Sequence, residues 1–297
     1  MKRRPPLTVV ALGGNALSPP GDARWLDNER AVVNAAAAEL ATLAGEGSRL
    51  LVVHGNGPQA GRLLSAQAGG GSEILDICVA QTQGELGYLL AASLEAHPGV
   101  GATVAVITRT IVDPTDPAFD DPTKPIGPVL AEQPTGFPAV EVPGRLGWRR
   151  VVASPRPLRV VEGAAIARLL EGAHVVAGGG GGVPVTGEGA PVAAVIDKDW
   201  VAALLAIELH ARQLVFVTDV PHAADGFGTI EARPIRKMHV SEARERLAAG
   251  MFAAGSMGPK VASAIEFVEA VGRRSVITTI GEMAAALRGE RGTTIVP

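Results

Sequence analysis

Short runs of apolar residues alternate along this chain with longer segments whose apolar positions recur at the period of an α-helix. The first run, "LTVVAL", is followed by an alanine-rich amphipathic segment and then by a second run, "RLLVVH". This alternation is typical of βαβ units and predicts an α/β fold with a largely parallel sheet. The predicted strands are 7–12, 49–54, 103–112, 174–177, 193–196, 213–220 and 275–279, and the predicted helices are 28–47, 58–68, 73–96, 163–173, 199–211 and 258–272.

The alternation stops between residues 113 and 157. Prolines accumulate there in "DPTDPAFDDPTKPIGP" and "EQPTGFP", and no helical period survives. A segment of this length is too long for an ordinary connection between a strand and a helix. We therefore expect a functional element, either a lid or a small subdomain that projects from the sheet.

Glycines cluster directly behind three of the apolar runs, in "VVALGGNAL", "LVVHGNGPQAG" and "VVAGGGGGVP". The carboxyl ends of parallel strands meet at one edge of a sheet, which is where open α/β sheets bind ligands. Glycine lets backbone N–H groups approach an anion closely. A flexible linker is the alternative for residues 178–182, but their apolar flanks favour a loop that binds a ligand. The three loops together predict a polyphosphate-sized anion site.

Composition and charge narrow the classes of partner. The length of 297 residues fits one large α/β domain or two smaller ones, and 47% hydrophobic residues suffice for a sizeable core. A net charge of -3 offers no basic surface for nucleic acid, so we expect small-molecule partners. The single cysteine, Cys78, excludes an internal disulfide and fits a reducing cytoplasm. No apolar run approaches the length needed to span a membrane, so we expect a cytoplasmic protein without membrane partners.

A dinucleotide site is one alternative for the second glycine loop. "GNGPQA" satisfies the G-x-G-x-x-G/A fingerprint behind a predicted strand, and Asp76 follows at about the distance of a ribose-binding acid. This pattern would indicate a nicotinamide-dependent oxidoreductase. Two features weaken it, because the fingerprint normally follows the first strand and because Asp76 falls in a predicted helix. The Walker A pattern of P-loop enzymes does not occur in the sequence.

Three lysines are candidates for phosphoryl-transfer chemistry, which needs cations and N–H donors around the transferring group. Lys124 lies in "PTKPIGP", Lys198 in "IDKDW" and Lys260 in "GSMGPK", so each follows or precedes glycine, proline or aspartate rather than a helical surface stripe. A solvated surface charge is the alternative for each. It is weakest for Lys198, which stands between Asp197 and Asp199. Asp199 could cap a helix, hold the lysines in place, or coordinate Mg²⁺ through water.

Seven motifs in a fixed order resemble those of the carbamate kinases in the amino acid kinase superfamily, over nearly the whole chain. They are "VVALGGNAL", "VVHGNGPQ", "DPTKPIGP", "GWRRVVASPRP", "GGGGVPV", "VIDKD" and "GSMGPK". The resemblance implies one three-layer α/β/α sandwich domain over 1–297, with a mainly parallel central sheet and a protruding subdomain at about 113–157. It also implies a homodimer and reversible, Mg²⁺-dependent phosphoryl transfer between carbamoyl phosphate and ADP, with ATP and carbamate on the other side. This family commonly makes ATP in arginine or purine breakdown.

The resemblance also implies site residues, with no residue assigned as a direct metal ligand. Lys124 would reach in as a mobile cation, Lys198 and Lys260 would neutralise phosphoryl oxygens, and Asp199 would organise these lysines. The expected substrate-binding residues are Gly13, Gly14, Asn15, Gly55 and Asn56. The expected nucleotide-binding residues are Gly178, Gly179, Asp197, Thr218, Asp219, Met257 and Gly258.

One loop departs from the family pattern. After "LVFVTDV" the family continues with an acid and then an asparagine–aromatic pair, whereas this chain has "PHAADGFGT", with Pro221 in place of the acid. Phe227 remains, but the asparagine does not. The nucleotide preference is therefore left open by the sequence. Two alternative functions also stay open: a kinase of this fold that phosphorylates another small acid, and a catalytically silent member that only binds ligands. We expect His54 to be a structural group rather than a general base, while Arg149 and Arg150 could bind anions or brace the projecting segment.

Overall fold

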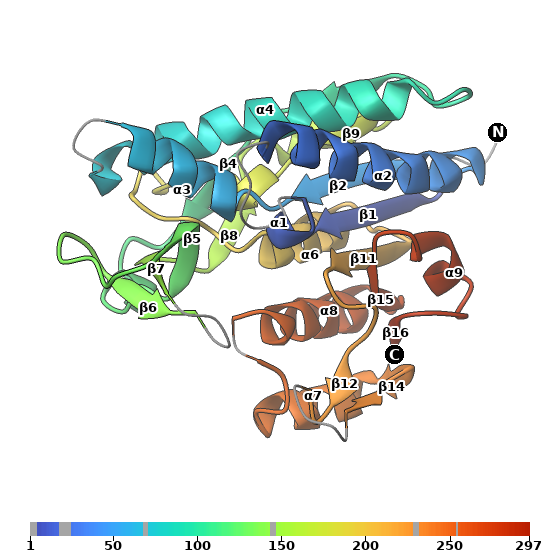
Figure 1. The fold of residues 1–297 in the computed structure, drawn as a ribbon. Coiled ribbons are helices and arrows are strands. Elements are labelled where there is room, and N and C mark those ends of the chain that lie inside the picture. The colour runs from blue at the N-terminus through green and yellow to red at the C-terminus, as the bar shows by residue number, and fades with distance from the viewer. Residues whose placement is uncertain (1–4, 18–24, 68–70, 143–146, 228–231, 254) are drawn as a thin grey trace.

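An eight-stranded sheet with helices on both faces forms the centre of the computed structural model, which describes residues 5–17, 25–67, 71–142, 147–227, 232–253 and 255–297 (Figure 1). The strand order is β14-β16-β15-β11-β1-β2-β9-β3, and neighbouring strands are parallel except for the β15–β16 pair. The strands are β1 (Leu7–Leu12), β2 (Arg49–His54), β3 (Thr103–Ala105), β9 (His174–Val176), β11 (Gln213–Thr218), β14 (Lys237–His239), β15 (Ser275–Thr279) and β16 (Thr293–Val296). The predicted fold class, an α/β/α sandwich with a mainly parallel sheet, is confirmed.

Alternation along the buried strands divides the core into two layers. Val10 and Leu12 of β1 pack with helices on one face, whereas Val9 and Ala11 pack with helices on the other. In Figure 1 the first face carries α2 and α4, and the second carries α6 and α8. The helices are α1 (Gly14–Leu17), α2 (Trp25–Gly45), α3 (Gly57–Ala66), α4 (Leu75–Glu95), α5 (Gly163–Leu169), α6 (Lys198–Glu208), α7 (Val240–Ala248), α8 (Met257–Val271) and α9 (Met283–Leu287). Because both faces of these strands are covered, the strands read as continuous apolar runs.

The described part of the chain also forms three smaller sheets and three short 3-10 helices, η1 (Ser72–Ile74), η2 (Pro117–Phe119) and η3 (Gly179–Gly181). The first of these sheets is antiparallel, with the order β5-β7-β6, and stands beside α3 in Figure 1. The second has the order β10-β4-β8, and the third pairs β12 with β13. Their strands are β4 (Arg109–Val112), β5 (Lys124–Leu130), β6 (Ala139–Glu141), β7 (Trp148–Val152), β8 (Pro157–Val160), β10 (Val183–Val185), β12 (Ala224–Asp225) and β13 (Arg233–Pro234). The β5-β7-β6 sheet lies within the segment where prolines had replaced the helical pattern.

Two strand predictions are wrong. The predicted strand 103–112 is divided into β3 and β4, which belong to different sheets. The break falls at Thr108, whose backbone N–H and hydroxyl both donate to the Gln83 side chain, at 2.9 Å each, and this turns the chain away from the central sheet. The predicted strand 193–196 joins no sheet. The apolar side chains of Ala194, Val195 and Ile196 are buried in the core, but their backbone does not pair with a neighbouring strand.

The contact between α3 and β5 leaves no room for a side chain. A Cβ atom on Gly61 would lie 2.0 Å from the backbone nitrogen of Gly127 and 2.2 Å from its Cα. We expect Gly61→Ala to lower the free energy of unfolding by about 1–3 kcal/mol, as overpacking does, and to displace the strand that begins at Lys124. Urea denaturation measures the loss. Gly84→Ala is the matched control because a Cβ there meets open space in α4, and it should stabilise by about 0.5–1 kcal/mol. Equal stabilities for Gly61→Ala and the wild type would contradict the close contact.

Candidate active site

The three glycine-rich loops meet at one edge of the central sheet, as predicted. β1 pairs with β2, and β2 pairs with β9, both in parallel, so the loops behind these strands emerge side by side. A cavity lies at this edge, and each of the three loops contributes glycines to its lining. The remaining lining comes from β5, β7, the start of α6, the end of β11 and the start of α8. The cavity is thus bordered by elements far apart in the sequence.

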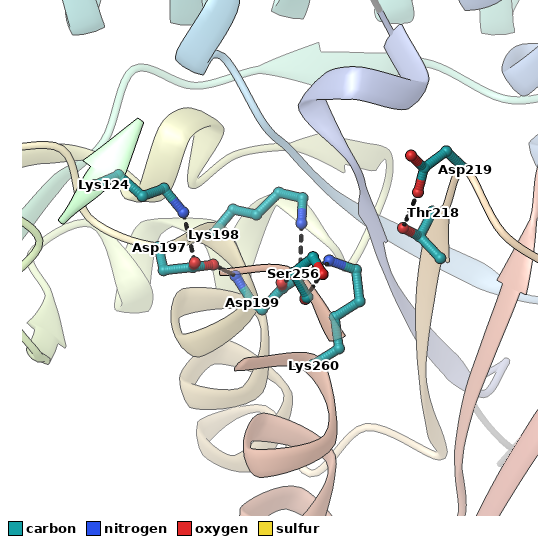
Figure 2. Close-up of polar contacts among 8 residues, drawn as sticks. All are labelled: Lys124, Asp197, Lys198, Asp199, Thr218, Asp219, Ser256 and Lys260. Carbon is teal, nitrogen blue, oxygen red and sulfur yellow. Dashed lines mark hydrogen bonds and ion pairs between the residues drawn. The ribbon is translucent and has the colours of Figure 1, made fainter. Parts of the chain in front are cut away.

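Asp197 is the N-cap of helix α6, directly before its first residue, Lys198. Its carboxylate accepts a hydrogen bond from the backbone N–H of Asp199 at 2.9 Å, which is the usual geometry of an N-cap. The other carboxylate oxygen accepts from Lys124 Nζ at 2.5 Å, which ties the first residue of β5 to the helix (Figure 2). The capping role considered for Asp199 is therefore wrong, because Asp197 fills it. The carboxylate of Asp199 is left for the lysines.

Asp199 holds one lysine on each of its oxygens. Lys198 Nζ lies 2.6 Å from Oδ1, and Lys260 Nζ lies 3.2 Å from Oδ2 (Figure 2). Lys260 Nζ also donates to the carbonyl of Ser256 at 3.2 Å. All three charged side chains are buried, and each lines the cavity. The arrangement concentrates two ammonium groups at one point and fixes both through a single carboxylate.

Burial and neighbouring charge shift the pKa values of this cluster in different directions. Burial alone would raise the pKa of Asp197, but the ammonium groups of Lys124 and Lys198 hold it well below its usual range. Burial lowers the pKa of Lys198, and Asp199 opposes that effect only in part. For Lys260, burial is outweighed by Asp199 and the other nearby carboxylates, so its pKa is raised. Lys260 is therefore cationic at neutral pH.

Close packing, rather than a need for flexibility, explains why the loop 178–182 consists of glycines. Gly180 has a φ of +60°, and a Cβ on it would lie 2.1 Å from the Asn56 side-chain amide. Gly181 has a φ of +84°, and its Cβ would lie 2.6 Å from the backbone oxygen of Ile196. Both conformations disfavour other residues, and both positions lack space. The loop therefore fits tightly between the second glycine loop and the chain that leads into α6.

The sequence profile of the amino acid kinase family matches residues 6–279. The chain belongs to this family. It is 44% identical to a carbamate kinase of Halobacterium salinarum, with 98% of each chain covered, and 40% identical to one of Pyrococcus horikoshii, with 99% of this chain and 100% of that one covered. The solved structure of a carbamate kinase from Giardia lamblia bound to AMP-PNP superimposes with a TM-score of 0.86 at 37% identity, covering 98% of each chain.

Membership of this family makes the chain a phosphotransferase, so the oxidoreductase alternative is wrong. Asp76, which that alternative used, lies in the first turn of α4 and is not among the residues that line the cavity. Within the described part of the chain, the kinase has no helix that combines the length and the apolar character needed to cross a membrane.

Most of the expected site residues gather at the cavity of this kinase. Those that line it are Gly13, Gly14, Gly55, Asn56, Lys124, Asp197, Lys198, Asp199, Thr218, Asp219 and Lys260. Four expected nucleotide-binding residues do not line it, namely Gly178, Gly179, Met257 and Gly258. The side chain of Asn15 lies outside the described part of the chain. Gly180 also lines the cavity, within the glycine loop 178–182 that the sequence predicts to bind a ligand. Ser256 lines it although the sequence reasoning did not select this residue.

The two arginines of "GWRR" have different surroundings. Arg149 lines the cavity, and its Nε is buried without a hydrogen-bond partner in the described part of the chain. Burial lowers its pKa. The guanidinium of Arg150 instead lies over the ring of Phe137, 4.5 Å from its centroid. The sequence left two interpretations open for these arginines. The position of Arg149 suits the binding of an anion, and that of Arg150 suits support of the projecting segment 113–157.

His54 lies beneath the glycine loops and is not among the residues that line the cavity. Its Nδ1–H donates to the carbonyl of Gly55 at 3.2 Å. Burial lowers its pKa from 6.5 to about 4. At neutral pH the ring is therefore uncharged and stays in place as a packing group, in agreement with the structural role expected for it.

The lowered pKa of His54 predicts a loss of stability in acid. Between pH 6.5 and about 4 the unfolded chain binds this proton and the folded chain does not, so the free energy of unfolding falls as the pH falls through that window. The full difference is up to about 3 kcal/mol. Urea denaturation from pH 7 to pH 4.5 should show a shallower decline for His54→Gln than for the wild type. Parallel declines would contradict the lowered pKa.

Proposed function

We propose that this kinase transfers a phosphoryl group reversibly between carbamoyl phosphate and ADP, giving ATP and carbamate. The observation that carries the proposal is the cluster of Lys124, Lys198 and Lys260, held by two aspartates where the glycine loops converge. Relatives that match almost the whole chain are carbamate kinases, and the solved relative from Giardia lamblia binds an ATP analogue. A cavity of this kind suits anionic substrates that carry phosphate.

The transfer requires positioning and neutralisation of charge rather than a general base. Toward ATP, an oxygen of the β-phosphate of ADP attacks phosphorus, and the bond between that phosphorus and the carbamate oxygen breaks. Carbamate leaves as an anion, so no proton has to move. Lys198 and Lys260 would meet the charge on the phosphoryl oxygens, and glycine N–H groups would supply further donors. In the reverse direction the anionic carbamate oxygen attacks the γ-phosphate of ATP.

We further propose that Mg²⁺ accompanies the nucleotide. The described residues contain no group of three or more His, Cys, Asp or Glu side chains suited to a metal ion. Mg²⁺ is commonly held by phosphates and water with one or two carboxylates, and Asp219 is an exposed carboxylate in the cavity lining. The donor set fits such a shared site. When bound, the ion would offset the charge of the phosphates.

We make further proposals on the base of the nucleotide, the domain organisation, the oligomeric state, the cellular location and the direction of the reaction. We propose that the base is adenine, although the family pattern is altered in residues 221–229, of which 228 and 229 lie outside the described chain. Phe227 is exposed and could stack on a base. We also propose a single domain with its protruding segment at about 113–157, a homodimer, a cytoplasmic location, and a direction toward ATP in arginine or purine breakdown.

ATP formation from carbamoyl phosphate and Mg-ADP tests the proposed function. We expect ATP to accumulate in a coupled hexokinase assay. When GDP replaces ADP, we expect the product GTP to form more slowly than ATP does. A catalytically silent member would bind these ligands without forming ATP. A kinase for another small acid would form ATP from that acid's phosphate and not from carbamoyl phosphate. Either outcome would reject the proposal.

A further inference from the structure

We infer that the side-chain oxygen of Asn56 accepts a hydrogen bond from an N–H group of the substrate, which makes Asn56 a specificity-determining residue. The inference deepens the proposed function and rests on it. Asn56 lines the cavity, is 1% exposed and directly follows Gly55, the first glycine of the second glycine loop. Its Oδ1 has no hydrogen-bond partner in the described part of the chain. A buried acceptor of this kind is costly unless a ligand satisfies it.

The orientation of the Asn56 amide follows from its neighbours. Nδ2 donates to the hydroxyl of Thr82 at 2.7 Å. That hydroxyl has one hydrogen, which is engaged with the helix carbonyls of Cys78 and Val79 at 3.0 and 2.9 Å. The hydroxyl can therefore accept from Asn56 but has no hydrogen to give it. A flipped amide would face oxygen with oxygen, so Oδ1 is the atom left free.

Helix capping does not use this oxygen either. Asn56 occupies the N-cap position of α3, where an asparagine side chain usually accepts from the N–H groups of the first turn. Here it makes no such bond. The face of the amide instead lies against Gly180, whose missing side chain leaves the space that the amide fills. Two contacts thus hold the amide in place while its buried oxygen is left without a hydrogen-bond partner among the described residues.

The substrate chemistry follows from that acceptor. Carbamate and carbamoyl phosphate carry an amino group, whose N–H can donate to Oδ1. Acetate and acetyl phosphate have a methyl group at the same position and would leave the buried oxygen unpaired. Sites built to bond a substrate N–H discriminate strongly against analogues that lack it. Asn56 would therefore select carbamoyl phosphate over acetyl phosphate.

The test compares carbamoyl phosphate and acetyl phosphate as phosphoryl donors to Mg-ADP. The ratio of their kcat/KM values should favour carbamoyl phosphate in the wild type and fall roughly 10- to 100-fold in Asn56→Ala, as expected for one lost hydrogen bond to a buried group. Thr82→Val should lower the ratio several-fold, because the amide is then free to turn. Thr42→Val is its matched control, since Thr42 is an exposed threonine that bonds the carbonyl of Ala38 in α2. The ratio of this control should not change.

The outcomes separate this inference from the function on which it rests. An equal fall with both donors in Asn56→Ala, leaving the ratio unchanged, would overturn the role in specificity while the kinase activity stands. If that variant does not fold, an unchanged ratio in Thr82→Val overturns the role in the same way. Absence of ATP from both donors in the wild type would reject the proposed function and the inference together.

Discussion

Replacing Lys260 by alanine should lower kcat for ATP formation by roughly 100-fold or more, as the loss of one preorganised donor to developing charge commonly does. Lys260 is buried at the start of α8 and is fixed by Asp199 and by the carbonyl of Ser256. Its raised pKa keeps it cationic over the whole neutral range. The charge is therefore already in position when the phosphoryl group transfers, and no reorganisation is needed.

Steady-state kinetics with carbamoyl phosphate and Mg-ADP measure the effect of Lys260→Ala. Lys237→Ala is the matched control, because Lys237 is exposed on β14 and is not among the residues that line the cavity. It should leave kcat unchanged. Turnover at the wild-type rate in Lys260→Ala would exclude the assigned role. A change confined to KM would indicate that the lysine binds substrate and transition state equally.

Replacing Asp199 by alanine should lower the free energy of unfolding by about 3–5 kcal/mol, because removal of one partner leaves buried charge uncompensated. Lys198 and Lys260 share this carboxylate, and both side chains are less than a tenth exposed. Without it, two like charges face each other in the core. Burial favours the neutral form of a lysine amine. The stability difference between Asp199→Ala and the wild type should therefore become smaller as the pH approaches the ordinary lysine pKa of about 10.4.

Urea denaturation at pH 7 and at pH 9.5 measures the stability of Asp199→Ala. Asp219→Asn serves as the control, since Asp219 lines the same cavity but is exposed and bonds only to Thr218 in the interactions described for it. Its stability should lie within about 0.5 kcal/mol of the wild type, as for most surface changes. A similarly small loss in Asp199→Ala would show that the two lysines do not depend on this carboxylate.

The fold was largely predictable because its central strands are buried on both faces. Their apolar runs are long, and those of β1 and β2 are followed directly by glycine, so β1, β2 and β11 begin where the sequence predicts. The division between β3 and β4 was not predictable, because it depends on hydrogen bonds between Thr108 and Gln83, 25 positions away in the sequence. Local propensity contains no information about such a contact.

The candidate site was predictable in its lysines and less so in its partners. Lys198 stands between two aspartates, and the sequence suggested Asp199 as a helix cap, whereas Asp197 caps α6 in the structure. The partners of the two aspartates, Lys124 of β5 and Lys260 of α8, come from distant parts of the sequence and could not be assigned from it. Consecutive residues of a strand point to opposite faces, so only one of Arg149 and Arg150 faces the cavity. Which one does so depends on how β7 packs against its neighbours, and two adjacent arginines in a sequence do not reveal this.

Phosphorus-31 NMR of carbamoyl phosphate and Mg-ADP with the purified kinase tests the central claim most directly, because substrate, ATP and inorganic phosphate give separate signals. We predict that the carbamoyl phosphate signal declines as the ATP signals grow in equal amount, and that Lys198→Ala slows this transfer strongly while Lys237→Ala does not. Loss of carbamoyl phosphate to inorganic phosphate alone, or an unchanged spectrum, would contradict the assignment of the cavity to phosphoryl transfer between these two substrates.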